Sequence, residues 1–280
     1  MTMALSTPVA PAETRLSAVV KKTQGSAKTW RDHAVTIGTI VLLLVIWELF
    51  ARQANPILVA PPSKILQALF AMIADGTMGK ALLASSQPFV TGFLAAVAIG
   101  VPLGLLIGRF RYVEAALGWF IIVGYAMPMI ALVPVFMLWF GLGFTVKAVM
   151  VAVMTVFAIV INTWNGVQNV PRSLIEVGTA FNASPTRILT QIVLPSVIPS
   201  IMTGLRIGIG KAVIGIVIAE FFTALTGLGG VIVNAGGTFQ PDRMFAAVFV
   251  LSIIATGLTW LVGQLERRIA PWNHATTGDA

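Results

Sequence analysis

Residues 171–200 read PRSLIEVGTAFNASPTRILTQIVLPSVIPS, a polar stretch between two long apolar runs. The stretch is too polar to cross a bilayer, but it carries the start and stop signals of helices rather than the composition of a linker. Arg172 or Ser173 can begin a helix that continues to about Phe181. Asn182 is a good helix stop, because asparagine tolerates the left-handed conformation. The first half of the stretch therefore predicts one short helix with a defined end.

The second half of the stretch predicts another short helix. Ser184 is an N-cap candidate, and Pro185 suits the first helical position. Leu194 and Pro195 are expected to end this helix and to turn the chain into the next apolar run. We therefore predict a helix–turn–helix over residues 171–195 that lies on one face of a membrane.

The whole chain has the composition of a membrane protein. Of its 280 residues, 57% are hydrophobic and only 10% are charged, and the mean hydropathy is +0.92. A soluble domain is about 45–50% apolar and about 25% charged, so this chain could not cover a water-soluble surface. The net charge of +8 does not indicate nucleic-acid binding, because the basic residues lie in short tracts between apolar runs. The absence of cysteine excludes disulfides, thiolate metal sites and a cysteine nucleophile.

Apolar runs long enough to cross a bilayer, which takes about 20 helical residues, divide the chain into its expected spans. The third run is too long for one straight helix, and Pro128 and Pro134 should kink or break it. We therefore expect an all-α, polytopic fold with a transmembrane domain over residues 34–269. The six expected transmembrane helices are about 34–50, 88–107, 113–140, 146–165, 198–222 and 244–265.

The Lys and Arg residues set the expected orientation. An N-terminus in the cytoplasm places most basic residues of the tails and connections on the cytoplasmic side, as the positive-inside rule requires. Residues 1–33 lack the apolar core of a signal peptide close to Met1, so they are expected to form a cytoplasmic tail before an uncleaved first span. In this orientation the C-terminal tail, 270–280, and the segment 171–195 are also cytoplasmic.

Two connections on the opposite side have helical character of their own. Residues 60–70 read as the start of an amphipathic helix at the membrane interface, with Ser63 as the N-cap candidate. Residues 223–243 hold several glycines and an apolar patch, which fits a re-entrant or surface-lying segment.

Glycines recur at helical spacing in two of the expected spans. Gly100, Gly104 and Gly108 repeat every four residues in the second span, and Gly204 and Gly208 do so in the fifth. Small residues at this spacing let helices approach closely. We interpret both sets as packing within the chain in preference to a dimer seam.

The segment 171–195 resembles a cytoplasmic motif of ABC importer permeases. That motif reads E-A-A, three residues, G, nine residues, I, one residue, L-P. The matching positions of this chain are Glu176, Ile192, Leu194 and Pro195, and Ala180 in the three-residue spacer is counted with them as a residue of the loop.

The segment departs from the motif at two places. Val177 and Gly178 stand where Ala-Ala is usual, and Asn182 stands where Gly is usual. Asn182 can take the left-handed conformation that glycine would supply. Gly178 keeps the close approach of a small residue, at some cost in helix stability. We expect a working motif, with these positions as its weakest point.

Other short matches extend the resemblance over almost the whole chain, and they point to the nitrate/sulfonate/taurine branch of these permeases. Each match alone is weak, but their order and topology are specific. They are Trp47 and Glu48, Pro61 to Ser63, Thr203 to Arg206, Ala219 and Glu220, Gly227 to Gly229, and Leu265 to Arg268.

The resemblance implies a type I ABC importer permease in a bacterial inner membrane. Such a permease moves a small solute, for which an anion such as a sulfonate, nitrate or taurine is favoured. The implied partners are two ATP-binding cassette ATPase subunits that dock on the 171–195 segment, a periplasmic or lipid-anchored substrate-binding protein, a second copy of this chain, and membrane lipid. In the family, Glu176 would be a polar anchor in the docked surface; the alternative is a solvated carboxylate near a helix start.

The chain is not expected to hydrolyse ATP itself. A phosphate-binding loop requires G-x-x-x-x-G-K-[ST]. Before Lys211 this spacing fails, because Leu205 stands where the first glycine is needed and Ala212 follows the lysine. ATP must therefore be hydrolysed by a partner, and no cofactor, metal site or catalytic residue is expected in this chain.

Three charged residues lie within the expected fifth span, where charges are costly and usually face protein or water. Arg206 is close enough to the cytoplasmic end to snorkel, and its structural and pathway roles stay equally open. Glu220 near the outer end is favoured as structural. Lys211 lies near mid-membrane, where a cation on the pathway would favour an anionic solute. The alternative for Lys211 is pairing with carbonyls or with a neighbouring subunit.

Two other functions remain as alternatives. An ion-coupled secondary transporter or channel should hold intramembrane carboxylates, but only Glu48 and Glu220 come near, and both lie toward span ends. A membrane-embedded enzyme should show a cluster of His, Asp or Glu at one interface. His33 and His274 lie in polar end segments, so the sequence offers no such cluster.

Overall fold

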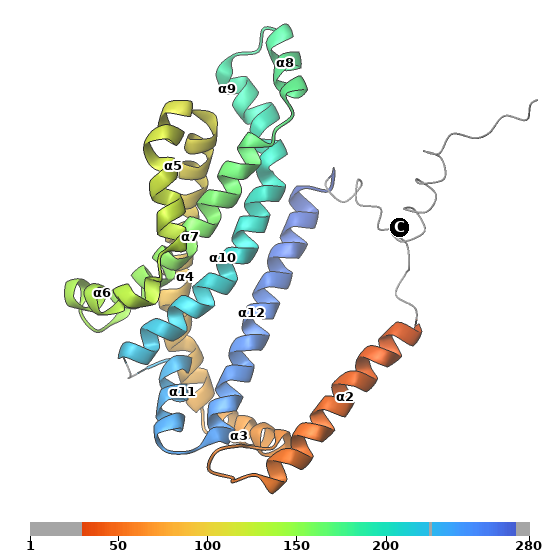
Figure 1. Ribbon diagram of the computed structural model, residues 1–280, viewed down its shortest axis with the longest axis vertical. Coiled ribbons are helices and arrows are strands. Elements are labelled where there is room, and N and C mark those ends of the chain that lie inside the picture. Colours follow the sequence, from red (N-terminus) through yellow and green to blue (C-terminus); the bar gives the residue numbers. More distant parts are fainter. Residues whose placement is uncertain (1–29, 224–225, 273–280) are drawn as a thin grey trace, which may run out of the picture.

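The computed structural model describes residues 30–223 and 226–272, and every element in these ranges is helical. Nearly all of the predicted N-terminal tail and most of the C-terminal tail lie outside the described residues. Figure 1 shows the arrangement. In chain order the elements are α2 (Trp30–Gln53), α3 (Pro62–Ala74), α4 (Thr77–Arg109), α5 (Arg111–Ala126), η1 (Met129–Leu132), α6 (Val133–Phe140), α7 (Phe144–Gln168), α8 (Arg172–Ala180), α9 (Pro185–Ile188), η2 (Leu189–Val193), α10 (Leu194–Thr223), α11 (Leu228–Gly237) and α12 (Pro241–Ile269).

Five of the described helices are long and apolar enough to cross a membrane, and a bent pair makes a sixth if it counts as one span. The expected all-α, polytopic fold is thus confirmed. The helices are longer than the apolar runs suggested: α4 begins at Thr77, before the range 88–107, and it continues through Pro88 and Pro102. Proline is tolerated in membrane helices where neighbouring groups satisfy the freed backbone.

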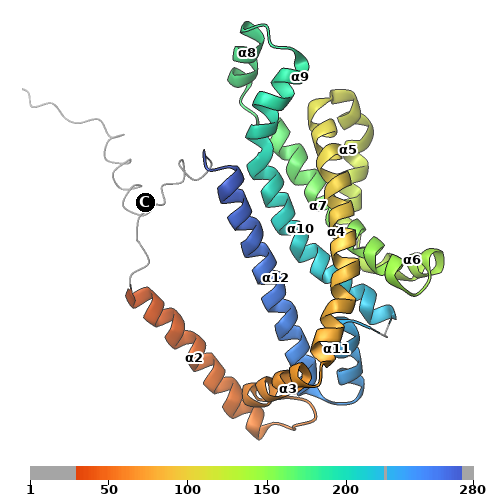
Figure 2. The same ribbon diagram turned by 180° about the vertical axis from the view of Figure 1, so that it is seen from behind.

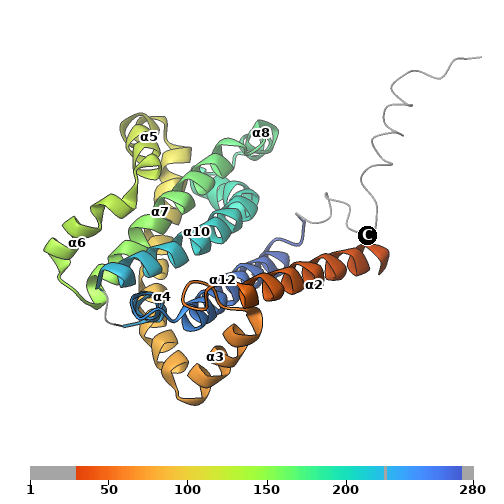
Figure 3. The same cartoon turned by 60° about the horizontal axis from the view of Figure 1, so that its bottom comes forward.

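The third run breaks, as its prolines predicted. The bent pair consists of Arg111–Ala126 and Met129–Phe140, which meet at 90°. Pro128 lies at the break, whereas Pro134 lies in the first turn of α6, where proline is well suited. Figure 3 shows the consequence: α6 projects from one side of the bundle, and α2 lies on the other.

Helix α7 forms the centre of the bundle, with α4 on one side and α10 on the other. Glycines bring both neighbours close to it. A Cβ at Gly104 would lie 2.6 Å from the Thr163 Cβ and 2.8 Å from the Val160 oxygen, and a Cβ at Gly208 would lie 3.1 Å from the Thr155 Cγ2. The interpretation of these glycines as packing sites within the chain is therefore confirmed.

Helices α3, α11 and α12 meet at the end of the bundle opposite α8 and α9 (Figure 2). Ser63 does not cap α3 as expected, because Pro61 and Pro62 start the helix earlier. Instead, Glu48 at the end of α2 accepts hydrogen bonds from the Ser63 N–H at 3.0 Å and from its hydroxyl at 2.7 Å. The glycine-rich connection forms α11, a short apolar helix packed on α12 and α10.

Helix α2 stands apart from the other spans in Figures 1 and 2. It contacts α3 at its end, and Trp47 and Phe245 stack edge to face with ring centroids 6.0 Å apart. Only 6% of its most apolar stretch is buried. Its surface therefore faces lipid or another protein chain.

The glycine contact between α4 and α7 gives a first prediction. Gly104→Ala should destabilise the protein by about 1–3 kcal/mol, the usual cost of overpacking, because the new methyl group meets Thr163 and the Val160 carbonyl. Gly79→Ala is the matched control on the same helix, since nothing lies within 4 Å of its Cβ. The thermal midpoint of the detergent-solubilised protein measures both. Equal midpoints for the two variants would contradict this packing.

Candidate functional site

Helices α8 and α9 lie at one extreme end of the molecule, beyond the ends of α7 and α10 (Figure 1). Helix α8 begins after Pro171 and ends at Ala180, close to the predicted range. We call residues 171–195 the coupling segment.

The turn after α8 depends on Asn182. Its φ is +53°, in the left-handed region that the sequence predicted. The Ala183 N–H donates to the Gly178 oxygen at 3.0 Å, and the Asn182 N–H donates to the Thr179 oxygen at 2.9 Å. These two bonds form a Schellman motif, which satisfies carbonyls that a helix end otherwise leaves free. Asparagine thus supports the turn at the position where the related motif has glycine.

Helix α9 starts as predicted. The Ser184 hydroxyl accepts a hydrogen bond from the Arg187 N–H at 3.3 Å, and Pro185 occupies the first turn. The prediction that Leu194 and Pro195 end this helix is wrong. The chain continues as one helix from Pro185 to Thr223, with a π turn over Leu189–Val193. The wider π turn admits Pro195, which cannot donate a hydrogen bond, at the start of α10.

Gly178 and Ile192, distant in the motif, are in contact. A Cβ at Gly178 would lie 2.7 Å from the Ile192 Cδ1 and 3.3 Å from the Ile188 Cγ1. Ile188 belongs to an apolar cluster with Val167 of α7 and Val197 of α10, against which Ile175 and Ile192 pack. The inner face of α8 is therefore fixed to the helix that leads into the bundle.

The outer face of α8 is apolar and exposed. Leu174, Val177 and Phe181 share this face because they are three and four residues apart, and Phe181 is 84% exposed. Glu176 and Ala180 are exposed as well. An exposed apolar face on a short, anchored helix is typical of a protein–protein contact.

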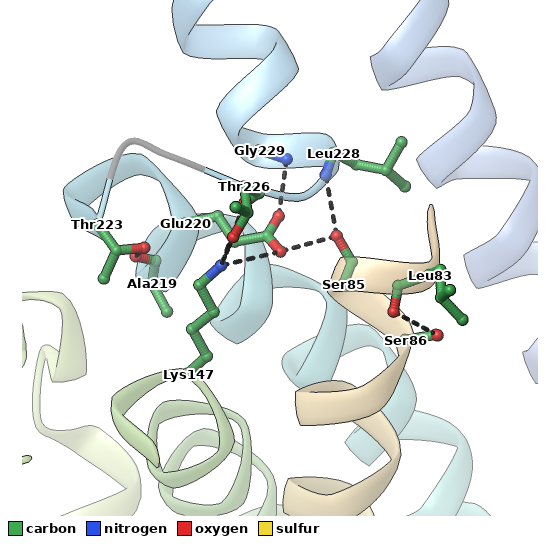
Figure 4. Close-up of polar contacts among 10 residues, drawn as sticks. All are labelled: Leu83, Ser85, Ser86, Lys147, Ala219, Glu220, Thr223, Thr226, Leu228 and Gly229. Atoms are coloured by element: carbon green, nitrogen blue, oxygen red, sulfur yellow. Dashed lines mark hydrogen bonds and ion pairs between the residues drawn. The ribbon is translucent and has the colours of Figure 1, made fainter. Parts of the chain in front are cut away.

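Glu220 lies near the end of α10 away from the coupling segment. It belongs to a buried polar cluster, which Figure 4 shows. Its carboxylate accepts hydrogen bonds from the Ser85 hydroxyl at 2.7 Å and from the Gly229 N–H at 2.8 Å. The Ser85 hydroxyl oxygen in turn accepts from the Leu228 N–H at 2.9 Å. The carboxylate therefore ties α4 and α10 to the start of α11, in agreement with the structural role that the sequence favoured.

Lys147 completes this cluster, and sequence reasoning missed it. Its Nζ lies 3.7 Å from Oε1 of Glu220 and donates to the Thr226 hydroxyl at 2.8 Å and the Thr226 carbonyl at 3.1 Å. Lys147 lies at the edge of the expected span 146–165, and nothing in the sequence indicated that it pairs with Glu220. Gly227 borders the same cluster: its φ is +94°, and a Cβ there would overlap the Glu220 carboxylate.

Arg206 forms an ion pair with Glu266 of α12. Glu266 is buried, whereas the Arg206 side chain is 43% exposed. Glu266 was noted only within the match at residues 265–268, and its partner could not be inferred because sixty residues separate the two.

Lys211 is half-buried in α10 beside the break of the bent pair. Its Nζ lies 5.1 Å from the centroid of the Tyr125 ring, a cation–π contact. The two side chains line a cavity of about 270 Å³ together with Met154 and Phe157. Among the described residues Lys211 has no carboxylate partner. The cavity therefore offers one unneutralised cation among apolar walls.

Comparisons with known proteins agree with this architecture. Residues 100–271 match a family model described as "Binding-protein-dependent transport system inner membrane component". The taurine transport system permease protein TauC of Escherichia coli is 30% identical over 250 residues, which is 87% of this chain and 91% of that protein. The riboflavin transport system permease protein RibX of Chloroflexus aurantiacus is 31% identical over 236 residues, 84% of this chain and 88% of that protein.

A solved structure shares the fold. It is titled as an inward-facing conformation of the MetNI methionine ABC transporter, and it superposes with a TM-score of 0.51 at 18% identity. The match covers 69% of this chain and 97% of the other. The fold is therefore that of an ABC importer permease.

The turn after α8 gives a second prediction. Asn182→Val should open the turn, because a β-branched residue in the left-handed conformation costs about 1–2 kcal/mol. Asn182→Gly should keep it. Hydrogen–deuterium exchange at the amides of residues 182 and 183 measures the difference in nanodiscs. Faster exchange in the glycine variant than in the valine variant would refute the role of Asn182.

The buried cluster gives a third prediction. Glu220→Gln and Lys147→Met should each destabilise the protein, because each leaves a buried charge without its partner. The double variant should be more stable than the sum of the two losses predicts, with a coupling of about 0.5–3 kcal/mol. The measurement is a double-mutant cycle: the thermal midpoints of the wild type, the two single variants and the double variant. Strictly additive losses would show that the ion pair is not an energetic unit.

Proposed function

Because this chain belongs to the family of binding-protein-dependent transport system inner membrane components, we propose that it couples solute import to a separate ATPase through its coupling segment. The two-sided helix α8 is the observation that carries the proposal. Its inner face is fixed by Gly178 and Ile192, and its outer face presents Leu174, Val177 and Phe181. The ATPase docks on the outer face, with Glu176 at the edge of the contact.

The anchored segment suits the transmission of movement. A displacement of α8 passes through the Gly178–Ile192 contact to the π turn η2, and from there along the unbroken helix Pro185–Thr223. That helix carries Lys211 past the break of the bent pair. ATP-driven movement of α8 therefore reaches the cavity at Lys211 without crossing a break in this helix.

The number of subunits in the assembly follows because each chain has one coupling segment, which can bind one ATPase subunit. Two copies of this permease serve two ATP-binding cassette subunits, and a substrate-binding protein delivers the solute from outside. Residues 34–269 form the transmembrane domain in the bacterial inner membrane, with the tails 1–33 and 270–280 in the cytoplasm on the side of the coupling segment. In this assembly the exposed surface of α2 contacts lipid or the second copy of the chain.

The solute is a small anion of the sulfonate, nitrate or taurine class. The related permeases are named after different solutes, taurine and riboflavin among them. Their names therefore do not identify the solute, and the proposal rests on the residues of the cavity at Lys211. Lys211 supplies one cation in a cavity of about 270 Å³, with Tyr125 holding the ammonium group until an anion replaces the ring. The pathway role belongs to Lys211, because Arg206 and Glu220 are engaged in ion pairs.

The outer face of α8 gives the fourth prediction. Phe181→Ser should weaken binding of the ATPase about thirtyfold, because an interface aromatic contributes about 2 kcal/mol or more. Tyr112→Ser is the control: Tyr112 is 90% exposed but lies at the start of α5, outside the coupling segment. Co-purification and ATPase titration measure both variants. Loss of binding in the Tyr112 variant alone would place the docking surface elsewhere.

The cavity gives the fifth prediction. Lys211→Met should preserve assembly with the ATPase but lower the initial rate of anion uptake, because the pathway loses its cation. Lys211→Arg should retain most of the rate. Uptake of radiolabelled taurine or alkyl sulfonate into proteoliposomes with the complete complex provides the measurement. Unchanged uptake kinetics in Lys211→Met would remove Lys211 from the pathway while leaving the coupling proposal standing.

A further inference from the structure

A second groove lies between α10 and α12, and the proposed import mechanism does not use it. Its volume is about 670 Å³, and it lies along the half of α12 that points toward the end of the bundle with α8 and α9. The side chains that matter for its chemistry are Arg206, Thr259, Trp260, Gln264, Glu266 and Arg267.

The groove is positively charged. Glu266 is buried and paired with Arg206, so one charge of each sign is neutralised there. Arg267 is exposed and forms no ion pair within residues 30–223 and 226–272. Arg206, whose side chain is 43% exposed, lines the same groove. The groove therefore presents guanidinium donors with a net positive charge, which suits a phosphate.

The residue types along one face of α12 change in the order expected for a helix that contacts a lipid along its length. Phe249, Ile253, Trp260 and Arg267 lie on one face of the helix, since they are four or seven residues apart. Phe249 and Ile253 are more than half exposed, and Trp260 is 64% exposed. Along this face the order is apolar, then aromatic, then cationic. That order matches hydrocarbon, membrane interface and headgroup.

We propose that the α10–α12 groove binds an anionic phospholipid. Its phosphate contacts Arg267 and the exposed edge of Arg206, with the Gln264 amide as an additional donor, and one acyl chain lies along Ile253 and Phe249. Basic grooves between membrane helices recognise anionic headgroups in this way. A zwitterionic lipid such as phosphatidylcholine is disfavoured, because its choline would add a cation beside the two arginines.

The proposal concerns a helix that the import mechanism moves. Helix α10 is continuous with the coupling segment, and its groove with α12 changes shape whenever α10 moves relative to α12. A lipid held by an arginine from each helix stabilises the arrangement in which both contact its phosphate. The bound lipid is thus a determinant of the resting conformation, whichever solute is carried.

Tryptophan quenching tests the site directly. The full-length chain is reconstituted into vesicles of dioleoylphosphatidylcholine with a minority of dioleoylphosphatidylglycerol. The bromine quencher is placed either on the phosphatidylglycerol or on an equal amount of phosphatidylcholine, so that the composition stays the same. The chain has seven tryptophans, so the Trp260 contribution is obtained by subtracting the signal of Trp260→Phe.

We expect brominated phosphatidylglycerol to quench Trp260 more strongly than brominated phosphatidylcholine does. Arg267→Gln should reduce this preference about fivefold, the factor expected for one basic residue near a membrane surface. Arg243→Gln, an exposed arginine at the opposite end of α12, should leave the preference unchanged.

Three results would overturn the proposal. Equal quenching by the two lipids would show that the groove does not select anionic lipid. Absence of quenching by either would show that another protein segment, such as α2 of a second copy, fills the groove. A preference that persists in Arg267→Gln, with the folded state verified by its thermal midpoint, would place the recognition elsewhere.

Discussion

The close approach of α4 and α10 to α7 is the contact on which the rest of the structure depends. Glycines on both outer helices face α7, so backbone meets side chain with no room for a methyl group. In lipid no hydrophobic force holds helices together, and close van der Waals packing takes its place. This contact fixes α10, and α10 carries the coupling segment at one end and Glu220 at the other.

Two polar arrangements complete the scaffold. Glu220 holds α11 to α4 and α10 through Ser85, Lys147 and the backbone at Gly229, and Arg206 joins α10 to α12 through Glu266. Each satisfies charges that would be costly in a bilayer. Lys211 is the exception within α10, since an aromatic ring rather than a carboxylate faces its ammonium group. The contrast between the paired charges and Lys211 supports its assignment to the pathway.

Sequence signals from neighbouring residues predicted the local structure well. They did not predict contacts between residues far apart in the sequence. The left-handed turn at Asn182, the Ser184 cap and the break at Pro128 each depend on a few neighbouring residues. Pro195 misled the prediction, because the π turn that admits it has no composition signal. The partners Lys147 and Glu266 were missed since their helices meet only in the folded chain. The glycine pattern predicted close packing but not which helix it faced.

The central claim is that α8 moves as one body with the continuous helix Pro185–Thr223, which starts in the coupling segment and contains α10. Because the chain has no cysteine, single cysteines can be introduced and spin-labelled at exposed positions Thr179 of α8 and Thr190 of the π turn. Electron–electron distances between the two copies are then measured in the complete importer, without nucleotide and with ATP trapped by vanadate. The account predicts that both distances shorten together on trapping. A change at Thr179 with none at Thr190 would show that α8 moves alone, and would contradict coupling through the Gly178–Ile192 contact.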